Sequence, residues 1–187
     1  MFRYLASLSV AFLLFGMQAL SAAEKRHGHS HVHGVAEMNI VVEGKTVVVE
    51  FRSPSEGIMS FEHEAKSEAD KKKQDAAVKI LKERFAEMVI LDPKLGCAPG
   101  LAEVTIVLTD AAGKDAKHAK GDAKKSGEHR EVRARHIFTC QGDPAGSRVR
   151  FGVTKIFPNV PDLKVQALSG NKQSGATIKK DKGDVGL

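Results

Sequence analysis

The sequence predicts an α+β fold with a mostly antiparallel β-sheet, one long central helix and a disordered lysine-rich insertion. Several segments alternate apolar and polar residues with the period of a strand, and one segment has apolar residues with the period of a helix. Most of the predicted strands follow one another through short turns. Strands that are neighbours in sequence usually pair antiparallel, and a separate helix on such a sheet is typical of the α+β class.

The first two strands are predicted to form a β-hairpin. Glu43-Gly44-Lys45 supplies the turn, and Ser53-Pro54 ends the second strand. Apolar residues alternate on both sides of this turn, with Met38, Ile40 and Val42 before it and Val47, Val49 and Phe51 after it.

A single long helix is predicted to follow the hairpin. Ser67 and Asp70 have the spacing of a capping box, although Asp is a weaker partner than Glu or Gln. Asp92-Pro93 and Gly96 are expected to end the helix. Its apolar face comprises Ala77, Val78, Leu81, Phe85 and Met88.

The rest of the chain alternates again as strands. The third strand contains Val104, Ile106 and Leu108, the fourth Val132, Ala134, His136, Phe138 and Cys140, the fifth Val149, Phe151 and Val153, and the sixth Val165 and Ala167. Residues 174–179 add a short edge strand. Residues 110–128 are rich in Lys and lack an apolar period, which predicts a disordered insertion.

These elements predict one α+β domain over residues 35–180. A flexible His-rich segment, residues 24–34, precedes it, and residues 181–187 are expected to be a frayed tail. Arg3, the apolar run that follows and Ser21-Ala22-Ala23 predict a signal peptide over residues 1–23, cleaved after Ala23. The alternative is an uncleaved N-terminal anchor. Both hypotheses place the remaining residues on the far side of the membrane, and the first leaves no stable membrane insertion.

The composition argues against a nucleic-acid-binding protein. The net charge is +6, but the chain has no Trp and a single Tyr, within the predicted signal peptide. Export from the cytoplasm argues against that role more strongly.

Cys97 and Cys140 are the only cysteines, and an isolated pair in an oxidising compartment predicts a disulfide bond. Two thiolate metal ligands are the alternative.

The histidines are the candidate metal ligands. Four of the eight are His27, His29, His31 and His33, and this period of two places them on one side of an extended chain, where neighbours can converge on one ion. Zn²⁺, Cu²⁺ and Ni²⁺ all suit imidazole. A solvated tail with incidental histidines is the alternative interpretation.

Two other histidines are also of interest. His63 lies between Glu62 and Glu64, which suits a ligand or a histidine oriented by a carboxylate. His136 shares its strand face with Phe138, so we expect it to be half-buried.

The sequence contains none of the common catalytic motifs, so an enzyme is not expected. A hydrolytic zinc centre would need three fixed ligands, an open coordination position and a general base, for which Glu62 or Glu64 could serve. A hypothesis from another class, preferred to the hydrolase, is a structural or interaction protein whose basic face docks on an acidic partner or an anionic membrane surface.

The order of several short motifs resembles the ZrgA-type zinc-uptake family of bacterial periplasmic proteins, from His31 to Ile178. In the N-terminal half the motifs are HVHGVAEMN at 31–39, Ser53-Pro54, Phe61-Glu62-His63 and Gly96-Cys97. In the C-terminal half they are His129 with Glu131, Phe138 with Cys140, Phe157-Pro158 and Val165-Gln166.

The resemblance implies a periplasmic zinc-binding protein, without enzymatic activity, that assists a zinc ABC importer when zinc is scarce. His33, His63 and His129 match motif positions and are the metal ligands that it implies, with His27, His29 and His31 as additional collectors. The chain also departs from the family pattern. Residues 110–128 hold five lysines and one histidine where relatives commonly have a His/Asp-rich insertion, and His136 replaces an aromatic residue.

Overall fold

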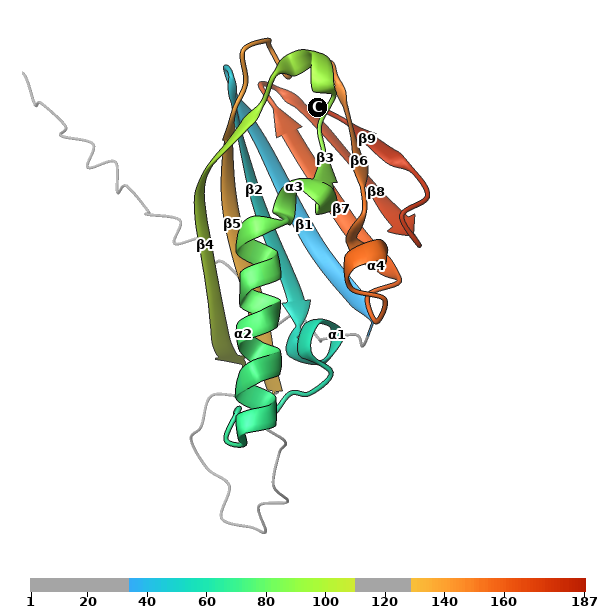
Figure 1. Cartoon of the computed structure of the whole chain (residues 1–187). Coiled ribbons are helices and arrows are strands. Elements are labelled where there is room, and N and C mark those ends of the chain that lie inside the picture. Colours follow the sequence, from blue (N-terminus) through green and yellow to red (C-terminus); the bar gives the residue numbers. More distant parts are fainter. Residues whose placement is uncertain (1–33, 110–128) are drawn as a thin grey trace, which may run out of the picture.

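Two β-sheets form the framework of the protein (Figure 1). A computed structural model of the chain describes residues 34–109 and 129–187. The strands are β1 (Val35–Glu43), β2 (Thr46–Pro54), β3 (Val89–Ile90), β4 (Ala98–Thr109), β5 (His129–Thr139), β6 (Arg148–Phe151), β7 (Asp162–Ser169), β8 (Lys172–Lys179) and β9 (Asp184–Gly186). Six of them form one sheet in the order β4-β5-β2-β1-β7-β8, and the others form a small sheet in the order β3-β6-β9.

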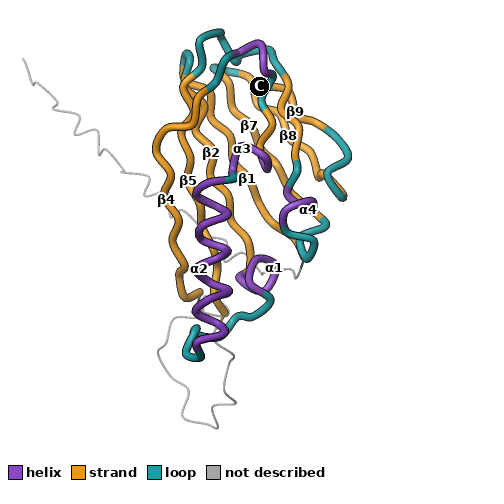
Figure 2. The backbone as a smooth tube through the Cα atoms, viewed as in Figure 1, coloured by secondary structure: helices purple, strands orange, loops and turns teal. Residues whose placement is uncertain are grey.

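The helices lie on one face of the six-stranded sheet (Figures 1 and 2). They are α1 (Ser55–Met59), α2 (Glu68–Glu83), α3 (Phe85–Met88), α4 (Val153–Ile156) and the 3₁₀ helix η1 (Pro93–Leu95). The prediction of one long central helix is therefore wrong, because the helical residues are divided among several pieces. Arg84, with φ −114° and ψ 16°, leaves the helical conformation and separates α2 from α3.

The predicted β-hairpin is confirmed. β1 and β2 pair antiparallel, with Ile40 opposite Val49. The prediction of an antiparallel sheet holds for most of the strand pairs, but β1 also pairs in parallel with β7, with Met38 opposite Val165. The six-stranded sheet is thus mixed. This long-range pairing leaves no local pattern in the sequence, because apolar alternation is the same for both strand directions.

The buried side chains form one hydrophobic core between the six-stranded sheet and the helices. Along β1 and β2, buried residues alternate with exposed or half-buried ones, as expected when one face of a sheet is covered. The predicted frayed tail is wrong: β9 pairs with β6, and Val185 and Leu187 are buried. The predicted fifth strand ends early, since Val153 begins α4.

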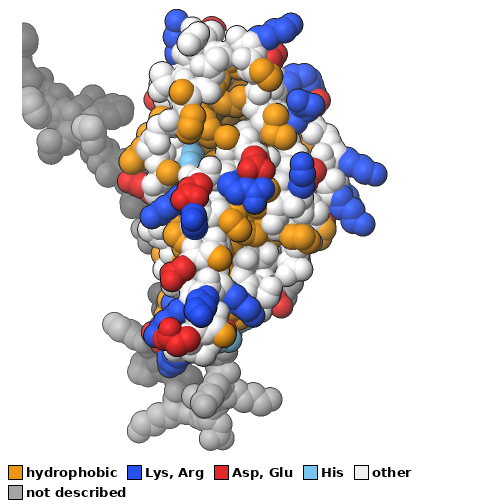
Figure 3. Space-filling view, viewed as in Figure 1, with side chains coloured by type: hydrophobic (Ala, Val, Ile, Leu, Met, Phe, Trp, Pro, Cys, Tyr) orange, Lys and Arg blue, Asp and Glu red, His pale blue; other side chains and the backbone are white. Residues whose placement is uncertain are grey.

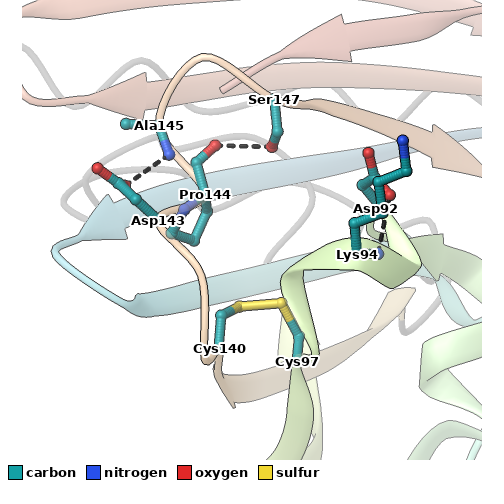
Figure 4. The surroundings of a disulfide bond; sticks show 8 residues. All are labelled: Asp92, Lys94, Cys97, Cys140, Asp143, Pro144, Ala145 and Ser147. Atoms are coloured by element: carbon teal, nitrogen blue, oxygen red, sulfur yellow. Dashed lines mark hydrogen bonds between the residues drawn. A yellow bond between two sulfur atoms is a disulfide. The ribbon is translucent and has the colours of Figure 1, made fainter.

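The predicted disulfide is confirmed. Cys97 and Cys140 are bonded, with an S–S distance of 1.99 Å (Figure 4). The bond ties the residue just before β4 to the residue just after β5, and it lies beside the η1 turn. The Gln141 and Gly142 backbone N–H groups both donate to the Leu95 carbonyl oxygen, which holds the same junction together.

His136 is more buried than the predicted half-buried position. Its side chain stacks on Phe85 at a centroid distance of 3.8 Å, and its Nε2 has no hydrogen-bond partner among the described residues. Burial lowers the pKa of His136 below its ordinary value of 6.5, against a smaller opposing effect of a hydrogen bond with the Leu81 backbone. His136 is therefore neutral in the folded protein at neutral pH.

Replacing His136 with Phe is expected to flatten the acid side of the stability profile. In the wild type the unfolded chain takes up a proton at His136 more readily than the folded chain does, so stability falls as the pH drops below about 6.5. This residue contributes at most about 1.4 kcal/mol per pH unit. Urea unfolding from pH 7 to pH 5 measures the slope. Variant His63→Gln, which removes an exposed imidazole, is the control, and equal slopes in the wild type and His136→Phe would contradict the assignment.

Several predictions fall on residues that the structure does not describe. They are the signal peptide, the His-rich segment up to His33, and the lysine-rich insertion.

Within the described residues, no helix is long and apolar enough to cross a membrane. On the helix-covered face, acidic and basic side chains are intermingled, so that this face is not uniformly basic (Figure 3).

Candidate metal site

Two of the predicted ligands, His63 and His129, are described by the structure. His27, His29, His31 and His33 lie outside the described residues. His63 belongs to the loop between α1 and α2, and His129 is the first residue of β5. These two histidines are far apart in the sequence, and the fold decides whether they can serve one site.

His129 is held at the end of the six-stranded sheet by its backbone and its ring. It pairs with Thr109, the last residue of β4, whose hydroxyl donates to the His129 carbonyl oxygen at 3.0 Å. The His129 Nδ1 lies 2.5 Å from the Glu62 Oε2. Glu62 is 18% exposed and His129 37%, so the pair is partly shielded from water. This contact fixes the ring and directs Nε2 away from Glu62.

His63 is oriented by the first turn of α2. Its Nε2 lies 3.3 Å from the Asp70 Oδ2, which also accepts a hydrogen bond from the Ser67 hydroxyl at 2.6 Å. Ser67 is the predicted N-cap, and its Oγ accepts from the Asp70 backbone N–H. The hydrogen bond from Ser67 and then the one from His63 lower the pKa of Asp70. The carboxylate is thus available to hold His63 over a wide pH range.

The loop between α1 and α2 is anchored on both sides of these contacts. Phe61 is buried, its carbonyl oxygen accepts from the Ser55 hydroxyl at 2.9 Å, and its ring lies 4.9 Å from the ring of His63. Glu62 and His63 follow directly, and Glu62 reaches across to His129. The loop therefore brings both histidines to the same end of the sheet, each with a carboxylate on one ring nitrogen.

This pairing of imidazole with carboxylate is typical of metal ligands. A histidine that binds a metal ion usually donates through its other ring nitrogen to a carboxylate, which sets the tautomer and the ring direction. Here Nε2 of His129 and Nδ1 of His63 are the nitrogens that could face a metal ion. Among residues 34–109 and 129–187, however, no group of three or more His, Cys, Asp or Glu side chains could hold a metal ion.

The His-rich segment joins the fold at this same end of the sheet. Gly34 precedes β1, has φ +76°, and its carbonyl oxygen accepts from the Asp162 N–H at 3.3 Å. Only β2 separates β1 from β5, so the two strands lie about 10 Å apart. Seven residues of extended chain span roughly 23 Å. The chain from Gly34 to His27, His29 or His31 is therefore long enough to reach Glu62 and His129.

Asp70 was missed as a site residue. The capping-box spacing already singled it out, but its contact with His63 depends on how the preceding loop folds back. Glu62 was considered as a possible base or as a carboxylate that orients His63, and not as the partner of His129. The predicted function did not use His136, and the structure places it in the core. His118, the one histidine of the lysine-rich insertion, lies outside the described residues.

A protein-family model, described as ZrgA family zinc uptake protein, matches residues 30–187. No curated protein matches the chain. The family match includes His31, His33, His63 and His129 and both cysteines. The motifs that suggested this resemblance thus lie within the matched region.

Proposed function

Because the chain belongs to the ZrgA family of zinc uptake proteins, we propose that it captures zinc in the periplasm and assists zinc uptake by an ABC importer. The role is one of binding and delivery, without catalysis. The observation that carries the proposal is the pair of histidine–carboxylate contacts, Glu62 with His129 and Asp70 with His63, where the His-rich segment enters the fold.

The tight zinc site in this proposal combines ordered and N-terminal ligands. His129 binds through Nε2 and His63 through Nδ1, while Glu62 and Asp70 orient the two rings. His33, the histidine nearest to Gly34, completes the ligand set, since zinc usually takes four ligands in a closed site and keeps an open position in an exchanging one. His27, His29 and His31 collect further ions and pass them to this site.

The choice of zinc as the metal rests on the family to which the chain belongs and not on the types of ligand. Imidazole sites of this kind generally bind copper more tightly than zinc, and nickel also suits them. The disulfide between Cys97 and Cys140 supports an oxidising location such as the periplasm. It also removes both thiolates from the possible zinc ligands.

Deleting residues 27–31 is expected to remove the weaker zinc ions and to leave the tightest one bound. A chain segment that orders around each ion binds weakly, because part of the binding free energy offsets the ordering. Native mass spectrometry, with and without zinc, counts the ions on the wild type and on the deletion variant. A deletion of equal length, residues 123–127, which contains no His, Cys, Asp or Glu, is the control. Failure of the wild type to bind any zinc would overturn the proposed function.

A further inference from the structure

The six-stranded sheet has a second face on which no described helix or strand packs. Side chains alternate along each strand, and the buried members of β1 and β2 face the helices. The intervening side chains point to the opposite side and are exposed or half-buried. We use the term outer face for this side, which carries Val41, Val48, Ile137 and Leu168.

A continuous apolar row crosses the outer face. Val41 lies opposite Val48 in β2 and opposite Leu168 in β7, and Val48 lies opposite Ile137 in β5. Leu101 extends the row into β4, where a bulge sets it beside Ile137. Leu168 is 45% exposed and Leu101 49% exposed, which makes them two of the three most exposed large apolar residues that the structure describes. A row of this kind across five strands is unusual for a face that remains in water.

Polar residues border the row on one side, two residues further along each strand. The first polar row contains Asn39, with Glu50 and Gln166 as its register partners. The second contains Glu37, with Arg52 and Lys164 as its register partners. Apolar residues thus lie beside a band of mixed charge.

The outer face is complementary to itself. A two-fold axis that runs parallel to the strands, between β1 and β2, maps each row onto itself in reverse order. Val41 then faces the partner's Val48, and Ile137 faces the partner's Leu168. In the polar rows Arg52 faces the partner's Glu37, and Glu50 faces the partner's Asn39. One pair of like charges, Arg133 and the partner's Lys164, would face each other. This pair lies in the second polar row, which is the row farther from the apolar row.

The shape of the face agrees with this arrangement. A shallow depression of about 320 Å³ between β1 and β7 is lined by Val41, Leu168 and Gln166, among others. The same two-fold axis brings the partner's Ile137 to it. Five strands about 4.8 Å apart and about 30 Å long give a footprint near 700 Å², close to the 800 Å² per partner of a typical stable interface.

We propose that two copies of this chain associate through their outer faces, with the two sheets packed face to face about this two-fold axis. The interface lies on the side of the sheet opposite the helices. On β5, Ile137 in the apolar row is eight residues from His129, roughly 27 Å of extended strand. The apolar row is therefore separate from the proposed zinc ligands, and dimerisation should not require zinc.

Sedimentation velocity of the purified protein tests this interface. The wild type should sediment as a dimer, and Leu168→Glu and Ile137→Glu should each weaken the dimer at least about tenfold by placing a charge against an apolar partner. Leu108→Glu is the matched control, because Leu108 is 56% exposed but lies outside the row, and it should leave the dimer intact. Circular dichroism confirms that each variant is folded; Leu168 is exposed enough that its variant serves if Ile137→Glu does not fold.

Exchanging the charges of Arg52 and Glu37 tests whether the two sheets pack in the proposed orientation. Arg52→Glu and Glu37→Arg should each weaken the dimer, and the double variant should recover it. A wild type that stays monomeric at the highest concentration it tolerates would overturn the proposal. So would a dimer that Leu168→Glu and Leu108→Glu weaken equally.

Discussion

Replacing both cysteines with serine is expected to lower the free energy of unfolding by about 4 kcal/mol. The bond between Cys97 and Cys140 closes a loop with a sequence separation of 43 residues. Opening that loop gives the unfolded chain more conformational freedom than the folded chain, which keeps the β4–β5 pairing. β4 is an edge strand with mostly exposed side chains, so packing compensates little for the lost link.

Urea unfolding of the wild type and of Cys97→Ser/Cys140→Ser measures this loss. Reductant supplies the internal control, since it should destabilise the wild type to the level of the double variant and leave the double variant unchanged. A wild type that does not respond to reductant under denaturing conditions would show that the bond is absent. His129, which contacts Glu62, begins β5, whereas Cys140 follows the end of β5. The disulfide therefore lies at the opposite end of the sheet from these residues, and zinc affinity should be the same in both proteins.

Features encoded by neighbouring residues were predictable from the sequence. The β1–β2 hairpin follows from alternation around Gly44, and the start of α2 follows from Ser67 and Asp70. The helix break at Arg84 was not predictable from the apolar period, because Leu81, Phe85 and Met88 all face the core on both sides of it. The parallel pairing of β1 with β7 was missed for a different reason. It joins strands that are far apart in the chain, and the sequence of neither strand identifies the strand with which it pairs.

In the candidate site, too, local features were predictable from the sequence and long-range contacts were not. The types and spacing of its histidines, together with the family motifs, pointed to His63 and His129. The contact between Glu62 and His129 spans 67 positions of the sequence and could be found only from the fold. The buried C-terminal residues were also missed, since a tail rich in Lys, Asp and Gly gives little sign that Val185 and Leu187 reach the core.

In the proposed site, zinc binds tightly at the end of the sheet where Glu62, His63 and His129 lie. The double variant His63→Ala/His129→Ala should weaken the tightest zinc site by more than about 100-fold, because loss of the groups that only orient metal ligands already costs roughly 10–100-fold. His136→Phe is the matched control: it also removes one histidine, but from the core, and should bind zinc like the wild type.

Competition titration against a chromogenic zinc chelator, with circular dichroism to confirm folding, measures this affinity directly. We expect a tightly bound zinc ion in the wild type and in His136→Phe, and its loss in the double variant. Equal affinity and stoichiometry in all three proteins would contradict it and would place the site elsewhere in the chain.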